Sequence, residues 1–367
     1  MPFKPASAAK TVFYNLLIFF VIANVLYWAI PVGGAISRLY KTSLVETWFR
    51  TIRPSYSDID PGWVRQHWME LNQGETVYRS HIGWRHAPSA GKTITVEGPF
   101  LQRRTVNAGI LGDRKAYFFG GSTLWGIGSD DAGTIPSQFA ARTGIHSENF
   151  AEHGWVAHQS LIFLIQLLEA GHRPDLVVFY DGANDALQKC RPEIGPEAHE
   201  RERQFDTVLR NSLRPDSFSH FFAPMVALAQ RVNERLGWIG GTEWSECHRN
   251  PQKAAAIAEN LLRDWRLAKQ LIEGYGGKFV GILQPVAYFS RTRVDYLALS
   301  ADDQAQYAAV YPLIRAKIAH GGEFHDLTSV LDVEEAIYLD WCHLPPKGNR
   351  YVVEKIAEIV APLGFGR

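Results

Sequence analysis

The sequence has no excess of charge of either sign. Its 38 lysine and arginine residues equal its 38 aspartate and glutamate residues, so the formal net charge is zero. A protein that binds nucleic acid through phosphates needs a basic surface, and this composition indicates none. We therefore expect no nucleic-acid partner, while protein partners stay open.

Cysteine is scarce, and the common metal-binding spacings are missing. The cysteines Cys190, Cys247 and Cys342 form no C-x-x-C pair, and the 13 histidines form no H-E-x-x-H motif. Proteins commonly hold zinc with such spacings. The sequence therefore predicts no metal site, and we expect no cofactor.

Internal repeats and low-complexity linkers are also missing. The 367 residues are enough for one large α/β domain with extensions, or for two small domains. We divide the chain into an N-terminal tail with a membrane anchor (1–34), an accessory region packed on the main domain (35–114) and the main domain (115–367). An insertion at about 187–252 interrupts the main domain.

One long hydrophobic run stands near the N-terminus. Residues 12–30 are 19 positions without a charge. As a helix they would span about 29 Å, close to the hydrocarbon thickness of a bilayer. Tyr27 and Trp28 lie where an interfacial aromatic belt would be, and Pro31 ends the helix. A transmembrane anchor is the preferred interpretation; a cleaved signal peptide and a buried core helix are the alternatives.

The orientation of this anchor is ambiguous in the sequence. Lys4 and Lys10 precede the run, whereas Arg38, Lys41 and Arg50 are among the basic residues that follow it. A bare positive-inside count would place the large domain in the cytoplasm. Long domains translocate largely regardless of such charges, so we expect a single-pass membrane protein with its main domain outside the cytoplasm.

The main domain alternates apolar runs with helical periodicity. Apolar runs end at 119, 180 and 286, and a short one covers 324–328. Helical patterns fall between or after them, at 134–142, 159–170, 254–272, 302–319 and 346–361. Strand, helix and strand in this order predict right-handed crossovers and an α/β fold with a doubly wound parallel sheet.

The accessory region reads as short strands around charged turns. Thr93, Thr95 and Glu97 alternate with Ile94 and Val96, as in a half-buried strand. A nearby group, His81, Trp84, Arg85 and His86, is interpreted as a packed loop, with substrate contact as the alternative.

Cys190 and Cys247 bracket the insertion. In an oxidising compartment they could form a disulfide at its stem, whereas two free thiols are the equally weighted alternative.

A serine follows the first apolar run at a tight turn. Residues 115–126 read K-A-Y-F-F-G-G-S-T-L-W-G, so two glycines end the strand directly before Ser122. The loops beyond the carboxyl ends of parallel strands are where open α/β sheets bind ligands. Ser122 is the candidate nucleophile, although such a turn by itself is common loop chemistry. Trp125 could stack on a substrate, but packing under the turn is preferred.

A base and an orienting acid lie near the C-terminus. Asp340 and His343 are three residues apart in D-W-C-H, so a tight turn can place both side chains on one side. Asp340 would then bind Nδ1 of His343 and leave Nε2 free for the serine proton. The alternative is an exposed acid and a capping histidine before a helix.

Donors for an oxyanion follow two further strands. They are the N–H of Gly154 and the side-chain amide of Asn184, and the N–H of Ser122 would be the third. Turn roles are the alternative for Gly154 and Asn184.

Four blocks together resemble the SGNH (GDSL-like) hydrolase family: G-G-S-T-L-W-G, Gly154, G-A-N-D at 182–185, and D-W-C-H. The resemblance covers roughly residue 115 to the C-terminus. It implies a flavodoxin-like α/β/α fold, metal-free ester hydrolysis and the roles given above. The sequence departs from the family at Gly121, where an acid is usual; Gly121 is a second possible substrate contact.

The predicted function is a membrane-anchored serine esterase that removes acetyl or another small acyl group from a cell-envelope or extracellular polysaccharide. An O-acyltransferase using the same acyl-enzyme is one alternative. A non-catalytic glycan-binding or scaffold protein of an envelope assembly complex is another. The expected partners are an acylated glycan or other ester substrate and, through the N-terminal helix, the membrane.

Overall fold

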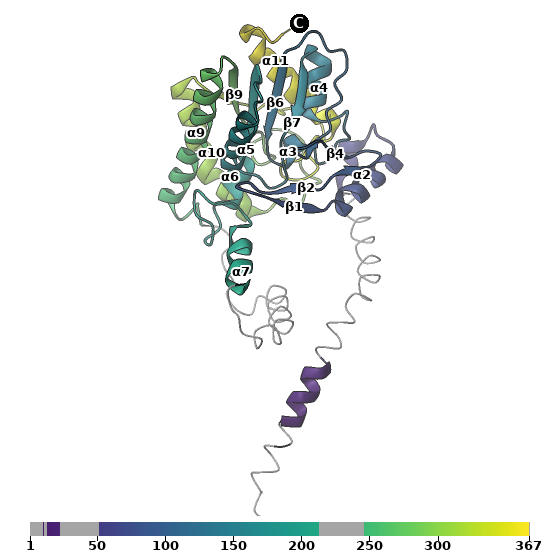
Figure 1. The fold of residues 1–367 in the computed structure, drawn as a ribbon, viewed down its shortest axis with the longest axis vertical. Coiled ribbons are helices and arrows are strands. Elements are labelled where there is room, and N and C mark those ends of the chain that lie inside the picture. The colour runs from purple at the N-terminus through teal and green to yellow at the C-terminus, as the bar shows by residue number, and fades with distance from the viewer. Residues whose placement is uncertain (1–9, 11–12, 23–50, 213–245, 367) are drawn as a thin grey trace, which may run out of the picture. The chain divides into compact units, whose positions relative to one another are not determined.

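The computed structural model describes residues 10, 13–22, 51–212 and 246–366 (Figure 1). The chain divides into two compact units. One comprises Met1–Arg50 and Gln204–Glu243, and the other comprises Thr51–Arg203 and Trp244–Arg367. The second unit contains every predicted catalytic residue and is described first.

An eight-stranded sheet forms the centre of this unit, in the order β10-β9-β8-β6-β7-β5-β4-β3. Five of its strands are parallel: β6 (Lys115–Gly120), β7 (His146–Asn149), β8 (Leu176–Asp181), β9 (Lys278–Leu283) and β10 (His325–Asp326). Numbered along the chain, these five have the doubly wound order 2-1-3-4-5. The chain order therefore reverses between β6 and β8, and that is the point where such sheets place their sites.

Helices cover both faces of the sheet. In Figure 1, α5 (Ala157–Glu169), α9 (Pro251–Gly274) and α10 (Ala301–Gly321) lie on one side, and α4 (Ile135–Thr143) and α11 (Pro346–Val360) lie on the other. The predicted helices at 134–142, 159–170, 254–272, 302–319 and 346–361 are confirmed. The remaining helices of this unit are α2 (Pro61–Gln73) and the shorter η1 (Arg53–Tyr56), α3 (Ser122–Trp125), α6 (Ala183–Gln188) and η2 (Ala361–Leu363).

Alternation along the strands builds the two cores. In β6, Tyr117 and Phe119 join the core under α5, α9 and α10, whereas Phe118 joins the core under α4 and α11. Successive strand side chains point to opposite faces, so an uninterrupted apolar run is needed where both faces are covered. The predicted third strand ends at Leu283 rather than at 286, since Pro285 has no N–H for the ladder.

The predicted accessory region extends the same sheet. Its strands β3 (Ser89–Ala90), β4 (Thr95–Glu97) and β5 (Gln102–Arg103) are antiparallel, and β5 pairs with β7. A separate hairpin comprises β1 (Thr76–Arg79) and β2 (Gly83–His86). The region is therefore continuous with the main domain through backbone pairing.

Two buried arginines attach this region to the turns at the strand ends. Arg103 donates to the carbonyl of Ser129 at 2.8 Å and to the carboxylate of Asp131 at 2.8 Å. Arg85 donates to the carbonyls of Phe150 and Ala151 at 2.9 and 2.8 Å. A fully buried guanidinium is stable only where its donors are used, so these bonds specify how the region docks.

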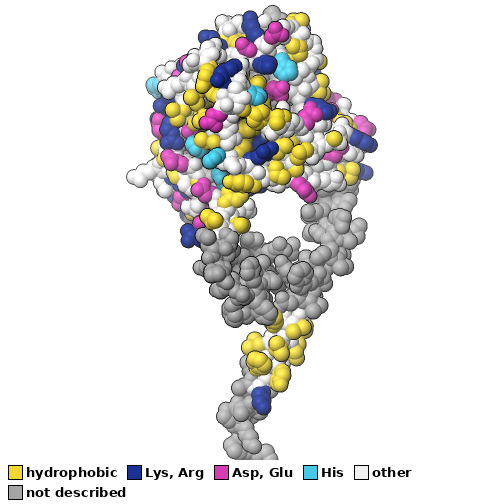
Figure 2. Space-filling view, in the orientation of Figure 1, with side chains coloured by type: hydrophobic (Ala, Val, Ile, Leu, Met, Phe, Trp, Pro, Cys, Tyr) yellow, Lys and Arg dark blue, Asp and Glu magenta, His cyan; other side chains and the backbone are white. Residues whose placement is uncertain are grey.

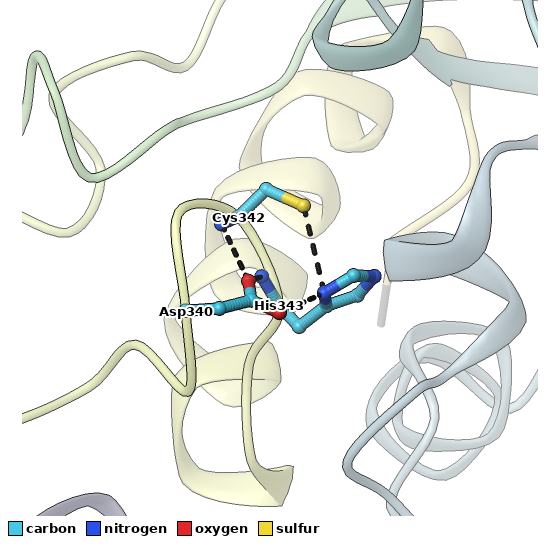
Figure 3. A group of neighbouring side chains, drawn as sticks. All are labelled: Asp340, Cys342 and His343. Carbon is cyan, nitrogen blue, oxygen red and sulfur yellow. Dashed lines mark hydrogen bonds and ion pairs between the residues drawn. The ribbon is translucent and has the colours of Figure 1, made fainter. Parts of the chain in front are cut away.

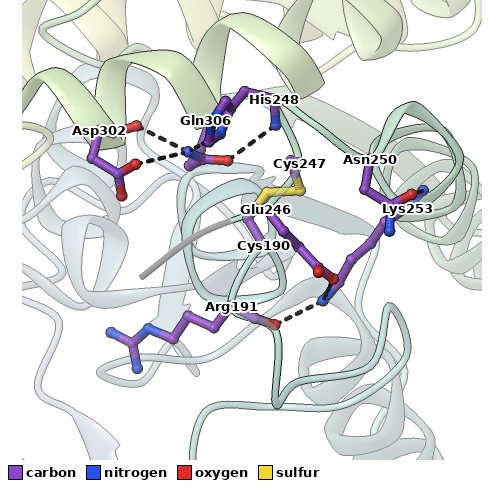
Figure 4. Close-up of a disulfide and its surroundings, with 9 residues drawn as sticks. All are labelled: Cys190, Arg191, Glu246, Cys247, His248, Asn250, Lys253, Asp302 and Gln306. Carbon is purple, nitrogen blue, oxygen red and sulfur yellow. Dashed lines mark hydrogen bonds and ion pairs between the residues drawn. A yellow bond between two sulfur atoms is a disulfide. The ribbon is translucent and has the colours of Figure 1, made fainter. Parts of the chain in front are cut away.

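A disulfide closes the stem of the insertion. It joins Cys190 to Cys247 across 57 residues (Figure 4). Beside it, Lys253 Nζ donates to the Arg191 carbonyl at 2.7 Å and to Glu246 at 2.8 Å. Residues 213–245 of the predicted insertion lie outside the described residues.

The other unit is described only in part. Residues 13–22 are helical, and hydrophobic side chains gather on this segment (Figure 2). Phe13, Leu16 and Phe19 are more than half exposed. The helix α7 (Glu202–Ser212) begins at the boundary between the units and carries an Asp206–Arg210 ion pair. Among the described residues, no helix has the length and hydropathy needed to cross a membrane. Within the predicted span 12–30, the structure describes only residues 13–22.

The disulfide predicts a redox-dependent stability. In the chain-entropy account, a cross-link across 57 residues contributes about 4 kcal/mol. We expect reductant to lower the melting temperature of the full-length protein by several degrees. The double variant Cys190→Ser, Cys247→Ser should melt at the same lower temperature with or without reductant. An equal melting temperature for oxidised and reduced wild-type protein, in a calorimetric scan, would contradict this prediction.

Candidate active site

Ser122 stands at the first residue of α3, directly after the central strand β6. Gly121 is the N-cap of this one-turn helix, and Gly126 ends it with φ 105°. A Cβ at Gly126 would lie 2.6 Å from Thr134 Cγ2, so both the backbone angle and the close approach require glycine. The turn thereby holds the Ser122 hydroxyl at the switch point of the sheet.

His343 approaches Ser122 from the loop before α11. Its Nε2 lies 2.7 Å from Ser122 Oγ, and its Nδ1 lies 2.6 Å from Asp340 Oδ2. The other oxygen of Asp340 accepts the backbone N–H groups of Cys342 and His343, both at 2.9 Å (Figure 3). The Asp340 carboxylate therefore holds the backbone turn at Cys342 and His343 and fixes the orientation of the His343 ring. With Nδ1 protonated toward Asp340, Nε2 accepts the serine proton.

The charges of this pair support each other. Burial acts to lower the pKa of His343, but the adjacent Asp340 carboxylate outweighs burial and raises the pKa well above 6.5. Burial acts to raise the pKa of Asp340, yet the His343 charge and the hydrogen bonds to that carboxylate lower it below 3.8. The arrangement thus favours a carboxylate beside an imidazole that readily takes up a proton.

Asp340, Cys342 and His343 also form a group of possible metal ligands. Their ligand atoms lie within 4.8 Å of one another. Both ring nitrogens of His343 are engaged, by Asp340 and Ser122. Burial raises the pKa of the Cys342 thiol, which favours the protonated form, whereas metals bind the thiolate. The donor set is therefore better suited to proton transfer than to metal binding.

The predicted oxyanion donor Asn184 lies against Gly121, the residue before Ser122. Asn184 Nδ2 donates to the Trp155 carbonyl at 2.9 Å, which uses one of its two hydrogens. Gln188 Nε2 donates to the Gly154 carbonyl at 3.2 Å and so fixes the peptide that follows. The N–H groups of Ser122 and Gly154 make no hydrogen bond to the residues that the structure describes.

Glycine is required at position 154 for two reasons. Its φ is 70°, in the left-handed region, and a Cβ there would lie 2.5 Å from Glu200 Oε1. Burial raises the pKa of this Glu200 carboxyl. Gly154 therefore lies directly beneath an acidic side chain from the stem of the insertion.

Gly121 lies beneath the amide of Asn184 and is buried. A Cβ at this position would overlap Asn184 Nδ2, so an acid in its place would displace the amide. Glycine at position 121, where the family that the sequence resembles usually has an acid, therefore leaves room for the Asn184 amide.

Trp125 is fully buried, with the Arg103 guanidinium 4.3 Å from its ring centroid. This position agrees with packing under the turn.

Sequence reasoning missed two carboxylates that position the site. Asp185 accepts the Ala157 N–H at 3.2 Å and pairs with Lys189 at 2.8 Å, which ties α6 to the start of α5. Glu152 accepts the N–H groups of His86 and His153, each at 2.7 Å. Asp185 belongs to the G-A-N-D block, but no sequence pattern indicates that it accepts a hydrogen bond from the Ala157 N–H.

Comparisons with known proteins give distant likenesses. No family model matches the chain, and no curated protein matches it. Among solved structures, a lipolytic protein of the G-D-S-L family from Veillonella parvula is 12% identical, with a TM-score of 0.40 over 68% of this chain and 99% of that one.

A carbohydrate acetylesterase family member from Sinorhizobium meliloti is 17% identical, with a TM-score of 0.35 over 68% of this chain and 99% of that one. An α/β hydrolase from the metagenome of Lake Arreo is 14% identical, with a TM-score of 0.35 over 70% and 98%. Likenesses at this level decide neither the chemistry nor the substrate of this chain.

The pKa values of two histidines should be shifted in opposite directions from 6.5. We expect His343 to titrate above pH 6.5 and His153 well below it, because Asp340 faces His343 whereas burial dominates at His153. Asp340→Asn should lower the pKa of His343, since the burial remains while the carboxylate is gone. Histidine NMR titration measures both values. An unchanged pKa of His343 in this variant would contradict the pairing.

Proposed function

We propose that the protein is a serine hydrolase that cleaves carboxylic esters by the chemistry of the SGNH family. The observation that carries the proposal is the hydrogen-bonded series from Asp340 through His343 to Ser122, with distances of 2.6 and 2.7 Å. Such a series converts a weak hydroxyl nucleophile into one that can attack a carbonyl carbon at neutral pH.

In the first half-reaction, Ser122 Oγ attacks the ester carbonyl carbon while His343 Nε2 takes the hydroxyl proton. Asp340 stabilises the resulting imidazolium. His343 then gives the proton to the leaving alkoxide, and the C–O bond of the ester breaks. In the second half-reaction, water loses a proton to His343 and attacks the acyl carbon. The bond between that carbon and Ser122 Oγ then breaks, His343 returns the proton to Oγ, and the carboxylic acid is released.

The carbonyl oxygen becomes negative in each half-reaction. The N–H groups of Ser122 and Gly154 and the second amide hydrogen of Asn184 are the donors for it. Because the Trp155 carbonyl already holds the Asn184 amide, little reorganisation of this donor is needed when the charge develops.

The proposed substrate is an acetyl or other small acyl ester on a cell-envelope glycan. The hydrophobic run 12–30 supports anchoring of the chain at a membrane. The Cys190–Cys247 disulfide supports placement of the main domain in an oxidising compartment. Together they favour an ester substrate at the cell envelope over a cytoplasmic one.

Removal of the nucleophile tests the reaction. We expect Ser122→Ala to lower the hydrolysis of phenyl acetate by the full-length protein by up to about 10⁶-fold in kcat. The matched control is Ser160→Ala, because Ser160 is also buried and its hydroxyl has no partner in the described structure. Equal rates in Ser122→Ala and wild type would remove the mechanism.

The same assay tests the oxyanion site. Asn184→Ala should lower kcat by about 10²–10³-fold with a smaller change in KM, because the amide acts on the charged intermediate. Asn260→Ala is the control, since Asn260 Nδ2 also donates to a backbone carbonyl, that of Pro196, at 3.2 Å. Equal losses of kcat in the two variants would show a general structural effect.

The compartment needs a separate experiment. With an alkaline phosphatase fused to the C-terminus, we expect phosphatase activity, because that enzyme requires an oxidising compartment. Deletion of residues 12–30 should abolish the activity. The intact mass of the membrane-extracted protein should include residues 12–30. An inactive full-length fusion, or a mass that lacks those residues, would refute the anchor in this orientation.

A further inference from the structure

A cavity lies beside the turn that carries Ser122. It has a volume of about 340 Å³ and is formed where the end of α2 faces the turn between β2 and β3. Glu70, Leu71, Gly74 and His86 contribute to its wall, and so does Trp125 of the nucleophile turn. Trp125 and Ser122 are the last and first residues of the same one-turn helix, so the cavity adjoins the nucleophile turn.

Three aromatic rings pack together at this cavity, and two of them, those of His86 and Trp125, line it. The ring of His86 is 4.7 Å from that of Trp125 and 4.3 Å from that of His153, and Trp125 and His153 are 4.2 Å apart. The charge of His343 also acts on His153. The rings therefore connect the cavity wall to the surroundings of the proposed catalytic base.

The ring cluster has polar atoms without partners. Trp125 Nε1 and His153 Nε2 are buried and make no hydrogen bond in the described structure. His86 is 7% exposed; its Nδ1 binds Glu152 Oε1 at 2.5 Å, and no described residue bonds its Nε2. Buried polar atoms normally have partners. Of these residues Trp125 and His86 line the cavity, so a ligand bound there is the candidate partner for their unpaired nitrogens.

The edge of His86 that carries Nε2 faces the cavity wall. A Cβ placed on Gly74, another wall residue, would lie 3.5 Å from Nε2 and 3.2 Å from Cδ2. Glu152 holds the opposite edge of the ring, so the orientation of Nε2 is fixed before a ligand binds.

The carboxyl groups in the cavity wall disfavour a negatively charged ligand. Burial acts to raise the pKa of Glu70, but hydrogen bonds from Gln66, Thr93 and Lys92 outweigh it and lower the pKa to about 2. Glu70 is therefore ionised, and Glu75 adds a second carboxyl. Leu71 and Trp125 add apolar surface. A neutral ligand with both hydroxyl groups and C–H faces suits this combination.

The volume suits one ring of such a ligand. About 340 Å³ lies at the low end of the roughly 300–1,000 Å³ typical of ligand pockets. We propose that this cavity binds one neutral sugar ring of the acylated glycan, with Trp125 Nε1 as donor and His86 Nε2 as its hydrogen-bonding partner. This inference rests on the proposed function and adds to it a subsite that orients the glycan.

Direct binding to an inactive protein tests the subsite. The full-length Ser122→Ala protein is titrated with methyl α-D-glucopyranoside and followed by ligand-observed NMR. We expect saturable binding with Kd on the order of 1 mM, and much weaker binding of the corresponding methyl glucuronide, whose carboxylate faces Glu70.

Added substitutions locate the binding. In the Ser122→Ala background, Trp125→Phe keeps a ring but removes Nε1, and His86→Asn keeps a donor toward Glu152 but removes Nε2. Each should raise Kd about 10-fold. Gly74→Ala, at φ −61° and ψ 128° that any residue can adopt, adds a methyl group 3.2 Å from His86 Cδ2; the ring must shift slightly, and binding should also weaken.

Matched controls lie away from the cavity. His146→Asn removes an imidazole that pairs with Glu148 at 2.9 Å, and Trp63→Phe removes an indole stacked on His67. Both should leave Kd unchanged. Circular dichroism of each variant verifies folding, and if one cavity variant does not fold, the other two decide the result.

Two results would overturn the proposal: no saturable binding of the glucoside, or equal Kd values in the cavity variants and the controls. Neither depends on catalysis. Failure of phenyl acetate hydrolysis would instead refute the proposed function and leave the binding result standing.

Discussion

The hydrogen bond between Ser122 and His343 joins residues 221 positions apart, and the rest of the site depends on that approach. The bond forms because β6 ends at the centre of the sheet while the loop before α11 crosses the same edge. Asp340 stabilises the bond because its carboxylate binds both the His343 imidazole, at Nδ1, and the backbone N–H of His343. The conformation of this loop is therefore fixed by the same carboxylate that sets the charge of the base.

Buried charges organise the surroundings of this bond. Arg85 and Arg103 attach the antiparallel strands to the turns that follow the parallel ones, and Glu152 lies between Arg85 and His86. Such groups are costly to bury without partners, so each of them permits few arrangements of the backbone. The antiparallel extension is consequently part of the site: it supplies the cavity wall and supports the nucleophile turn from below.

Small residues set the distances within the site. Gly121 leaves space for the Asn184 amide, and Gly154 leaves space for Glu200. The two glycines are bounded by side chains from different parts of the chain. Asn184 comes from α6, whereas Glu200 comes from the stem of the insertion that the disulfide closes. Glu200, a described residue of the insertion, therefore lies directly against one of the proposed oxyanion donors.

The residues that could take part in chemistry were recognisable in the sequence because local pattern and chain order carry that information. An apolar run that ends in Gly-Gly-Ser predicts a strand and a turn, and D-W-C-H predicts an acid and a base on one turn. Helical periodicity likewise indicated where the main helices lie. Tertiary structure alone decided which side chains meet. The joining of β5 to β7, the ring cluster of His86, Trp125 and His153, and the contact of Glu200 with Gly154 all depend on distant segments packing together, and a single sequence has no local pattern that specifies such contacts.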